Sequence, residues 1–272
     1  MKPISISEQM MFNTVRLQAG SSFGTGFFYD FKIDDKIYPT IITNKHVVNN
    51  KEIEVISFHL HLSDGDKGSD ENYKVTIKTK WYFHSSKDLC FCFINPVFER
   101  VKMETGKDVF YIGNDESILG SREKLEKLSA LEEVTMVGYP IGLWDEKNNF
   151  PIFRRGYTAS HPAFDFNDSG IGVVDMACFP GSSGSPIYVL NEKSYKEKGG
   201  GLCIGSRIVL LGILFAGPQY NAQGNIVVQT IPTQQTVGTA TPIMTNLGYY
   251  IKAEELQEFK ACLLYTSPSP RD

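Results

Sequence analysis

The sequence predicts an all-β protein whose antiparallel strands close into barrels or sandwiches. Short runs rich in Val, Ile, Phe, Tyr and Thr recur along the chain, among them FGTGFFYDF, IYPTIITN and LCFCFI. Turn residues separate these runs, and the 272 residues include 24 glycines and 13 prolines, as expected of a turn-rich β fold. A chain of this length can form one large domain or two small ones.

Helical patterns are confined to two segments. Residues 117–133, SILGSREKLEKLSALEE, carry leucines at helical spacing and predict a helix that links two β halves. The second segment, AEELQEFKACL, opens near Ala253 and predicts a helix that ends the domain. The final eleven residues, CLLYTSPSPRD, match codon by codon the translation of a transposase-type sequencing adapter. We therefore predict that 262–272 are a library artefact, and leave open whether the natural chain continues beyond Ala261.

Charge and composition argue against several classes of partner. The net charge of −4 provides no broad cationic surface for a phosphate backbone, so nucleic acid is not an expected partner. No run reaches the roughly 18 apolar residues of a membrane span, and the first residues lack the apolar core of a signal peptide. We therefore expect a cytoplasmic protein that does not contact a membrane. The sequence says nothing of its oligomeric state.

The cysteines and most histidines favour structural interpretations. Five cysteines, an odd number, do not predict a disulfide scaffold, and Cys90 and Cys92 alternate along a strand as two small apolar side chains on one face. His59 and His61 have no partner at ligand spacing and are expected at exposed strand positions, so no metal or cofactor is predicted. The polar segment 61–74 lies between strand-like runs and therefore predicts an exposed hairpin loop. Its aspartates do not predict a calcium loop, because the glycine and glutamate positions of that pattern do not fit.

Three serines stand in the loop FPGSSGSPIY, and one of them is a candidate nucleophile. A serine hydroxyl needs a base to take its proton and a third group to orient that base. Ser183 has glycines two residues before and one residue after it, which let the backbone bend sharply and a substrate carbonyl approach. Such a bend can aim the N–H groups of Gly181 and Ser183 at one point as an oxyanion hole. Ser182 and Ser185 more simply shape the loop. Alone, the segment is weak evidence, because a Gly/Ser turn of this kind often arises by chance.

Two further segments supply a base and an orienting carboxylate. PTIITNKHVVNN delivers His46 into a turn after an apolar strand, and HSSKDLCFCFI places Asp88 just before an alternating strand. Taken singly, His46 is a surface histidine and Asp88 a residue that starts a strand. His84 and His161 lack the context of a strand followed by a turn.

Together these segments resemble the trypsin-like serine proteases of the chymotrypsin fold, the PA clan. The resemblance covers nearly all of residues 12–260 and is closest to bacterial trypsin-like domains such as the HtrA group. It rests on six segments in order: GTGFF, TNKHVV, KDLCFCFI, GYPIG, GSSGSP and LLGILFAG. It implies a peptidase domain over 1–261 with two six-stranded antiparallel Greek-key barrels, over about 12–112 and 131–252, a short linker helix, and a C-terminal helix over about 253–261.

The resemblance also implies an activity, that of a serine endopeptidase that cleaves a polypeptide without a cofactor. His46 would accept the Ser183 proton and return it to the leaving amine, and Asp88 would orient the imidazole. The acyl-enzyme would form on Ser183, with Gly181 and Ser183 as oxyanion donors. The alternative left open is a non-catalytic binding or sensor module, as the N-terminal part of a larger protein.

Departures from the family bear on activation and specificity. Many members carry an aspartate where this chain has Ser182, so activation by a new N-terminal ammonium is not expected. The resemblance places Ala177 at the base of the primary pocket, which offers no carboxylate to Lys or Arg. Phe215 and Ala216 are apolar and Gly217 would leave the pocket mouth open. We expect a small or medium apolar side chain at the cleavage position, and substrate pairing with residues 215–217 as an added strand.

Overall fold

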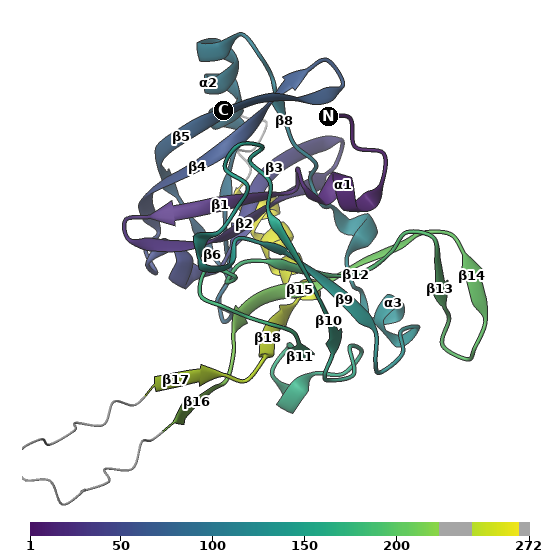
Figure 1. Ribbon diagram of the computed structural model, residues 1–272. Coiled ribbons are helices and arrows are strands. Elements are labelled where there is room, and N and C mark those ends of the chain that lie inside the picture. Colours follow the sequence, from purple (N-terminus) through teal and green to yellow (C-terminus); the bar gives the residue numbers. More distant parts are fainter. Residues whose placement is uncertain (223–240, 267–272) are drawn as a thin grey trace, which may run out of the picture.

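The computed structural model describes residues 1–222 and 241–266, and its fold is all-β with two strand-rich halves (Figure 1). The predicted fold class is confirmed. The N-terminal half lies above the C-terminal half in the view of Figure 1, and the helices are short. None of the helices within the described ranges is long and apolar enough to cross a membrane.

The N-terminal half is an antiparallel sheet ordered β5-β4-β1-β2-β3-β7-β6, with β8 paired to β4. Its strands are β1 (Thr14–Ala19), β2 (Ser22–Ile33), β3 (Lys36–Thr43), β4 (Ile53–Asp64), β5 (Lys67–Lys80), β6 (Tyr82–Phe83), β7 (Cys90–Phe93) and β8 (Val109–Phe110). Eight strands stand where six were predicted, because β6 and β8 add two-residue pairings at the margins. Cys90 and Cys92 are fully buried in the core of this half, as their alternation with phenylalanines predicts.

The C-terminal half closes into the six-stranded barrel that was predicted, in the order β10-β11-β18-β15-β12-β9. Its strands are β9 (Glu133–Gly138), β10 (Ile152–Thr158), β11 (Ile171–Asp175), β12 (Pro186–Asn191), β15 (Arg207–Ala216) and β18 (Leu247–Lys252). Two hairpins stand outside the barrel: β13 (Ser194–Lys196) with β14 (Leu202–Ile204), and β16 (Gln219–Ala222) with β17 (Thr241–Met244).

The linker helix is much shorter than the leucine spacing predicts. Only α3 (Arg122–Glu126) is α-helical between the halves, after the 3-10 turn η2 (Glu116–Ile118). Farther along, Ser129 N donates to Glu132 Oε1 at 2.7 Å, and Ala130 O accepts from Thr158 Oγ1 at 2.7 Å. These tertiary hydrogen bonds replace the helical ones, and the predicted helix over 117–133 is wrong in extent.

The polar segment 61–74 is mostly strand rather than loop. Strands β4 and β5 pair through it as far as Asp64 opposite Lys67, and only Gly65 and Asp66 form the turn. Gly65 has φ +64°, a conformation that glycine adopts at little cost. The exposed position predicted for His61 is also wrong, since the rings of Phe12 and Phe150 cover this side chain.

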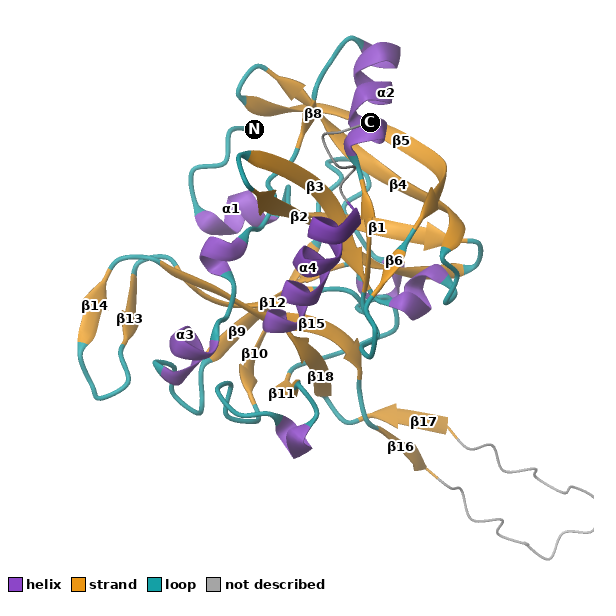
Figure 2. Ribbon diagram, turned by 180° about the vertical axis from the view of Figure 1, so that it is seen from behind, coloured by secondary structure: helices purple, strands orange, loops and turns teal. Residues whose placement is uncertain are grey.

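An apolar cluster joins the two halves, and the C-terminal helix crosses it. The 3-10 turn η5 (Ala253–Leu256) leads into α4 (Gln257–Thr266), which lies across both halves in Figure 2. Phe259 of α4 is buried against Phe91 of β7, with ring centroids 4.9 Å apart. The predicted C-terminal helix is confirmed and continues beyond Ala261 to Thr266. Residues 267–272 of the expected adapter segment lie outside the described residues. The remaining short elements are α1 (Ile6–Met10), α2 (Asn95–Thr105), η1 (Lys45–Val48), η3 (Pro140–Gly142) and η4 (Phe166–Asp168).

Candidate active site

His46 and Asp88 meet at one end of the N-terminal sheet. His46 lies in the turn η1 just after β3, and Asp88 lies just before β7, which pairs with β3. His46 Nδ1 is 2.6 Å from Asp88 Oδ2, and the backbone N of His46 donates to Asp88 Oδ1 at 3.2 Å. Asn44 Nδ2 also donates to the Asp88 carbonyl at 2.7 Å. The carboxylate therefore holds the proton on Nδ1 and leaves Nε2 free to accept one.

Asp88 is held in its charged form. Burial alone would raise the pKa of this carboxyl, but the hydrogen bonds from the ring and backbone of His46 outweigh burial and keep the pKa of Asp88 below its usual value. An ionised carboxylate beside Nδ1 can stabilise the imidazolium that forms when His46 takes up a proton.

The loop of Ser183 joins β11 to β12 and depends on two glycines. Gly181 and Gly184 have φ values of +87° and +84°. A side chain on Gly184 would put its Cβ 1.9 Å from Thr25 O, and one on Gly181 would put it 2.7 Å from Tyr139 O. Glycine is therefore required at both positions by conformation and by space.

Hydrogen bonding within this loop leaves two N–H groups free. The five consecutive carbonyls from 179 to 183 accept, in order, from Ser182 N at 3.0 Å, Ile141 N at 2.5 Å, Thr25 Oγ1 at 3.1 Å, Ser185 N at 3.0 Å and Thr25 N at 2.8 Å. Gly184 N donates to Leu214 O at 2.8 Å. The N–H groups of Gly181 and Ser183 donate to no other described residue. They are the two donors that the sequence predicts for an oxyanion hole.

The three serines of the loop differ in their surroundings. Ser182 is fully buried and its hydroxyl has no partner among the described residues. Ser185 is also fully buried and donates to Thr25 Oγ1 at 3.1 Å. Ser183 is half-buried, so its side chain is the accessible one. Within the described ranges, no hydrogen bond joins Ser183 Oγ to His46, and such contacts are often long before substrate binds.

The predicted pocket residues lie on the nucleophile loop and at the end of β15, and Ala177 contacts a cation that the sequence did not predict. Phe215 is half-buried, Ala216 ends β15 as an exposed residue, and Gly217 is the next residue. The carbonyl of Ala177 accepts from Arg154 Nη1 at 2.8 Å, and the Arg154 guanidinium lies 4.7 Å from the centre of the Phe179 ring. Because β10 brings Arg154 to Ala177 from 23 residues away, only strand register would have found it.

The turn that carries Asp88 is tied to the C-terminal helix. His84 was not predicted as a catalytic residue. It is buried, and its Nδ1 accepts from Lys87 N at 3.0 Å. Its Nε2 lies 3.4 Å from Glu255 and 3.2 Å from Glu258. Glu258 also accepts from Ser85 N at 2.7 Å. These contacts attach the turn to the C-terminal helical segment, so His84 has a structural role in the site.

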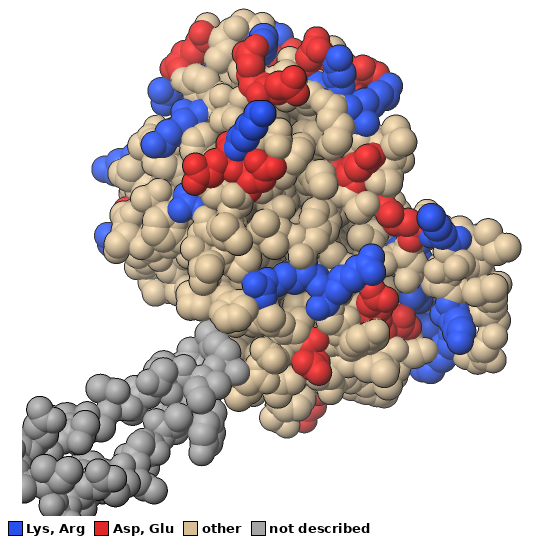
Figure 3. Space-filling view, viewed as in Figure 1, with Lys and Arg blue, Asp and Glu red and all other residues tan. Residues whose placement is uncertain are grey.

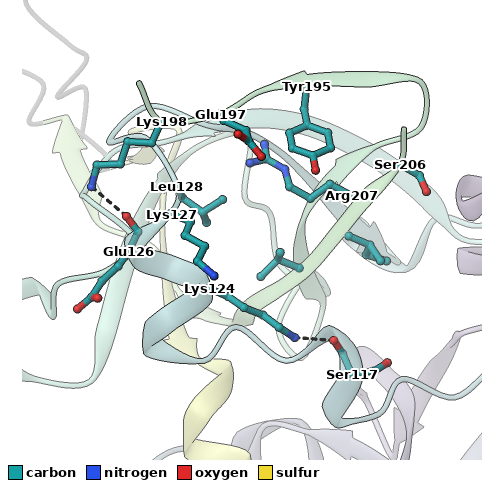
Figure 4. A pocket seen from close by; sticks show the side chains of 12 residues that line it. Ser117, Lys124, Glu126, Lys127, Leu128, Tyr195, Glu197, Lys198, Ser206 and Arg207 are labelled. Carbon is teal, nitrogen blue, oxygen red and sulfur yellow. Dashed lines mark hydrogen bonds between the residues drawn. The ribbon is translucent and has the colours of Figure 1, made fainter. Parts of the chain in front are cut away.

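A cavity of about 790 Å³ lies elsewhere, between α3 and the β13–β14 hairpin (Figure 4). None of the predicted site residues lines it. Its cations have partners already: Lys124 donates to the Ser117 carbonyl, and Arg207 pairs with Glu132 at 2.8 Å. On the face shown in Figure 3, acidic and basic side chains are mixed. We therefore place the candidate chemistry at His46, Asp88 and Ser183 rather than in the cavity.

Taken together, an antiparallel sheet packed against a closed six-stranded barrel matches the chymotrypsin fold of the trypsin-like serine proteases. Among solved structures, this chain is similar to human heparin binding protein. The match covers 96% of this chain and 96% of the heparin binding protein, with a TM-score of 0.50 and 8% identity. The chain is also similar to the Rv3671c protease in its inactive form. That match covers 93% of this chain and 89% of the Rv3671c chain, with a TM-score of 0.45 and 14% identity. No protein-family model matches the chain, and no curated protein matches it. Likeness at these identities shows the fold alone.

Proposed function

We propose that this chain is a serine endopeptidase with Ser183 as nucleophile, His46 as general base and acid, and Asp88 as the orienting carboxylate. The observation that carries the proposal is the state of the nucleophile loop. All five carbonyls from 179 to 183 have donors, while the N–H groups of Gly181 and Ser183 are free of partners among the described residues. Both residues are only half-buried, so a substrate oxygen can reach these two N–H groups. This arrangement fits a loop that stabilises an oxyanion.

In the proposed reaction, Ser183 Oγ attacks the substrate carbonyl carbon while its proton passes to His46 Nε2. The carbonyl oxygen becomes an oxyanion and accepts from the N–H groups of Gly181 and Ser183. The tetrahedral intermediate then expels the amine, which takes the proton from His46, and an acyl ester remains on Ser183. Water attacks the ester with His46 again as base, and the acid leaves with Ser183 regenerated.

The proposed substrate is a polypeptide bound as an extended strand. One edge of β15 pairs with β12, but beyond Leu214 this edge has no strand partner among the described residues. The same edge lies beside the nucleophile loop, because Gly184 N donates to Leu214 O. Backbone pairing with residues 215–217 would supply affinity independent of side chains. The apolar surfaces of Ala177 and Phe215 favour a small or medium apolar side chain at the cleavage position. A cytoplasmic location stays a prediction of the sequence.

A fluorophosphonate probe tests the proposal, because it reacts with an activated serine and the adduct can be located by mass spectrometry. We expect labelling of Ser183 in the full chain, no labelling in His46→Ala, and a fall in peptide turnover of at least about 10⁴-fold in Ser183→Ala. As a control in the same loop, the Ser182→Ala variant should still be labelled at Ser183. A folded wild-type protein without an adduct would instead favour the non-catalytic binding module.

A further inference from the structure

Thr25 of β2 is a fully buried residue of the N-terminal half whose hydroxyl serves the C-terminal half. Its Oγ1 donates to Gly181 O at 3.1 Å, and accepts from Tyr139 N and from Ser185 Oγ, each at 3.1 Å. A threonine hydroxyl has one proton and two lone pairs, so its bonding capacity is fully used. All three partners belong to the opposite half.

The backbone of Thr25 makes a second pair of bonds at the same place. Its N donates to Ser183 O at 2.8 Å, and its O accepts from Thr43 Oγ1 at 2.7 Å. Thr43 is the last residue of β3, three residues before His46. One buried residue therefore connects the loop of the candidate nucleophile to the strand that delivers the candidate base.

The hydroxyl of Thr25 also acts on the turn that orients Gly181. Tyr139, which donates to Thr25, begins the turn that continues to Ile141, and Ile141 N donates to Pro180 O at 2.5 Å. In a trans peptide the C=O and N–H point in opposite directions, so this bond turns the Gly181 N–H away from Ile141. Ile141 has φ +48°, which strains a β-branched residue by about 1–3 kcal/mol and persists only where surrounding contacts impose it.

We propose that the Thr25 hydroxyl is a positioning group that fixes the nucleophile loop and the oxyanion hole across the boundary between the two halves. It holds Gly181 O directly and holds the 139–142 turn through Tyr139 N. The inference rests on the proposed endopeptidase function. Thr25 touches no reacting atom in this scheme, and it acts through the direction of the Gly181 and Ser183 N–H groups.

Substitution by valine isolates the hydroxyl, because valine keeps the shape of threonine. In Thr25→Val, two donors and one acceptor would lose their partner in a fully buried place. Thr25→Ser keeps all three bonds. Thr40→Val is the matched control: Thr40 is another fully buried threonine of the same half, and its hydroxyl donates to Tyr29 O at 2.7 Å, away from the site.

We expect kcat to fall about 10²-fold in Thr25→Val with KM within about twofold, because a misplaced oxyanion hole affects the transition state rather than substrate binding. The affinity for a peptidyl boronate, which forms an anionic tetrahedral adduct on serine, should fall by a similar factor. Thr25→Ser and Thr40→Val should stay within about threefold of wild type in both measurements. A role in stability alone would lower the unfolding temperature of Thr25→Val and Thr40→Val alike without this selective loss.

The outcomes separate the inference from the function on which it rests. A wild-type protein that the fluorophosphonate does not label would overturn the proposed function. Labelled wild type with an unchanged kcat in folded Thr25→Val would overturn the role of Thr25 alone. If Thr25→Val does not fold, Thr25→Ala gives the same comparison, and a kcat equal to that of Thr25→Ser would overturn the inference.

Discussion

Acidification should destabilise this protein through one buried histidine, His61. The side chain is 6% exposed and packs against Phe12 and Phe150, with ring centroids 4.7 and 5.5 Å away. Burial lowers the pKa of His61 to about 4, and a hydrogen bond with the backbone of Asn149 offsets only part of this effect. His61 is therefore neutral in the folded protein under conditions where the unfolded chain would protonate it.

The sign and size of the effect follow from the two pKa values. An unfolded histidine titrates near 6.5, and each unit of pKa difference is worth about 1.4 kcal/mol. Above pH 6.5 both states are neutral and no stability is lost. As the pH falls toward 4, His61 takes up a proton in the unfolded state but stays neutral in the folded state. This difference lowers the free energy of unfolding by about 2 kcal/mol at pH 5 and by about 3 kcal/mol below both pKa values.

Urea unfolding at pH 7.5 and pH 5.0 measures this loss. The matched variant is His61→Phe, which keeps a ring between two phenylalanines and removes the titration. The free energy of unfolding should fall by about 2 kcal/mol more in the wild type than in the variant over this interval. Other groups titrate in both proteins and cancel in the difference. An equal fall in both proteins would refute the assignment of the acid sensitivity to His61.

Two substitutions test the geometry of the site itself. Gly184→Ala combines a φ of +84° with a Cβ 1.9 Å from Thr25 O, and should lower the free energy of unfolding by at least about 2 kcal/mol in a denaturant titration. Gly65→Ala, with φ +64° and open space, should lose only about 1 kcal/mol, and an equal loss in the two would argue against the close contact at Gly184. Asp88→Asn removes the carboxylate that holds His46 Nδ1–H, and kcat should fall about 10⁴-fold in steady-state kinetics; a loss below tenfold would contradict the proposed role.

The candidate site was predictable where it depends on local pattern. The pattern around Cys90 and Cys92 predicted the strand β7 and the position of Asp88 just before it, and both faces of this strand are buried. The glycines around Ser183 indicated a sharp bend, and the loop has one, with φ positive at Gly181 and Gly184. These features are set by neighbouring residues, so the sequence contains them directly.

Residues whose role comes from distant contacts were not predictable in the same way. Thr25 meets its partners 114, 156 and 160 positions along the chain, and no periodicity in β2 distinguishes it from its neighbours. The burial of His61 was not predictable for a related reason. Alternation assigns His61 to one face of β4, but only the packing of Phe12 and Phe150 decides that this face is covered.

The division of the site between the two halves has a consequence for its stability. His46 and Asp88 belong to the N-terminal sheet, whereas Gly181 and Ser183 belong to a loop of the C-terminal barrel. Neither half holds all four of these residues, so the geometry of the candidate site is only as rigid as the contact between the halves. Three features support that contact: the apolar cluster between the halves, α4, which contributes Phe259 to this cluster, and the hydrogen bonds of Thr25. Of these, the first two are non-directional apolar contacts that hold the halves together, and the bonds of Thr25 are directional ones that reach the loop itself. Apolar burial can therefore set how firmly the halves dock, while Thr25 sets the orientation in which the loop faces the strand of His46.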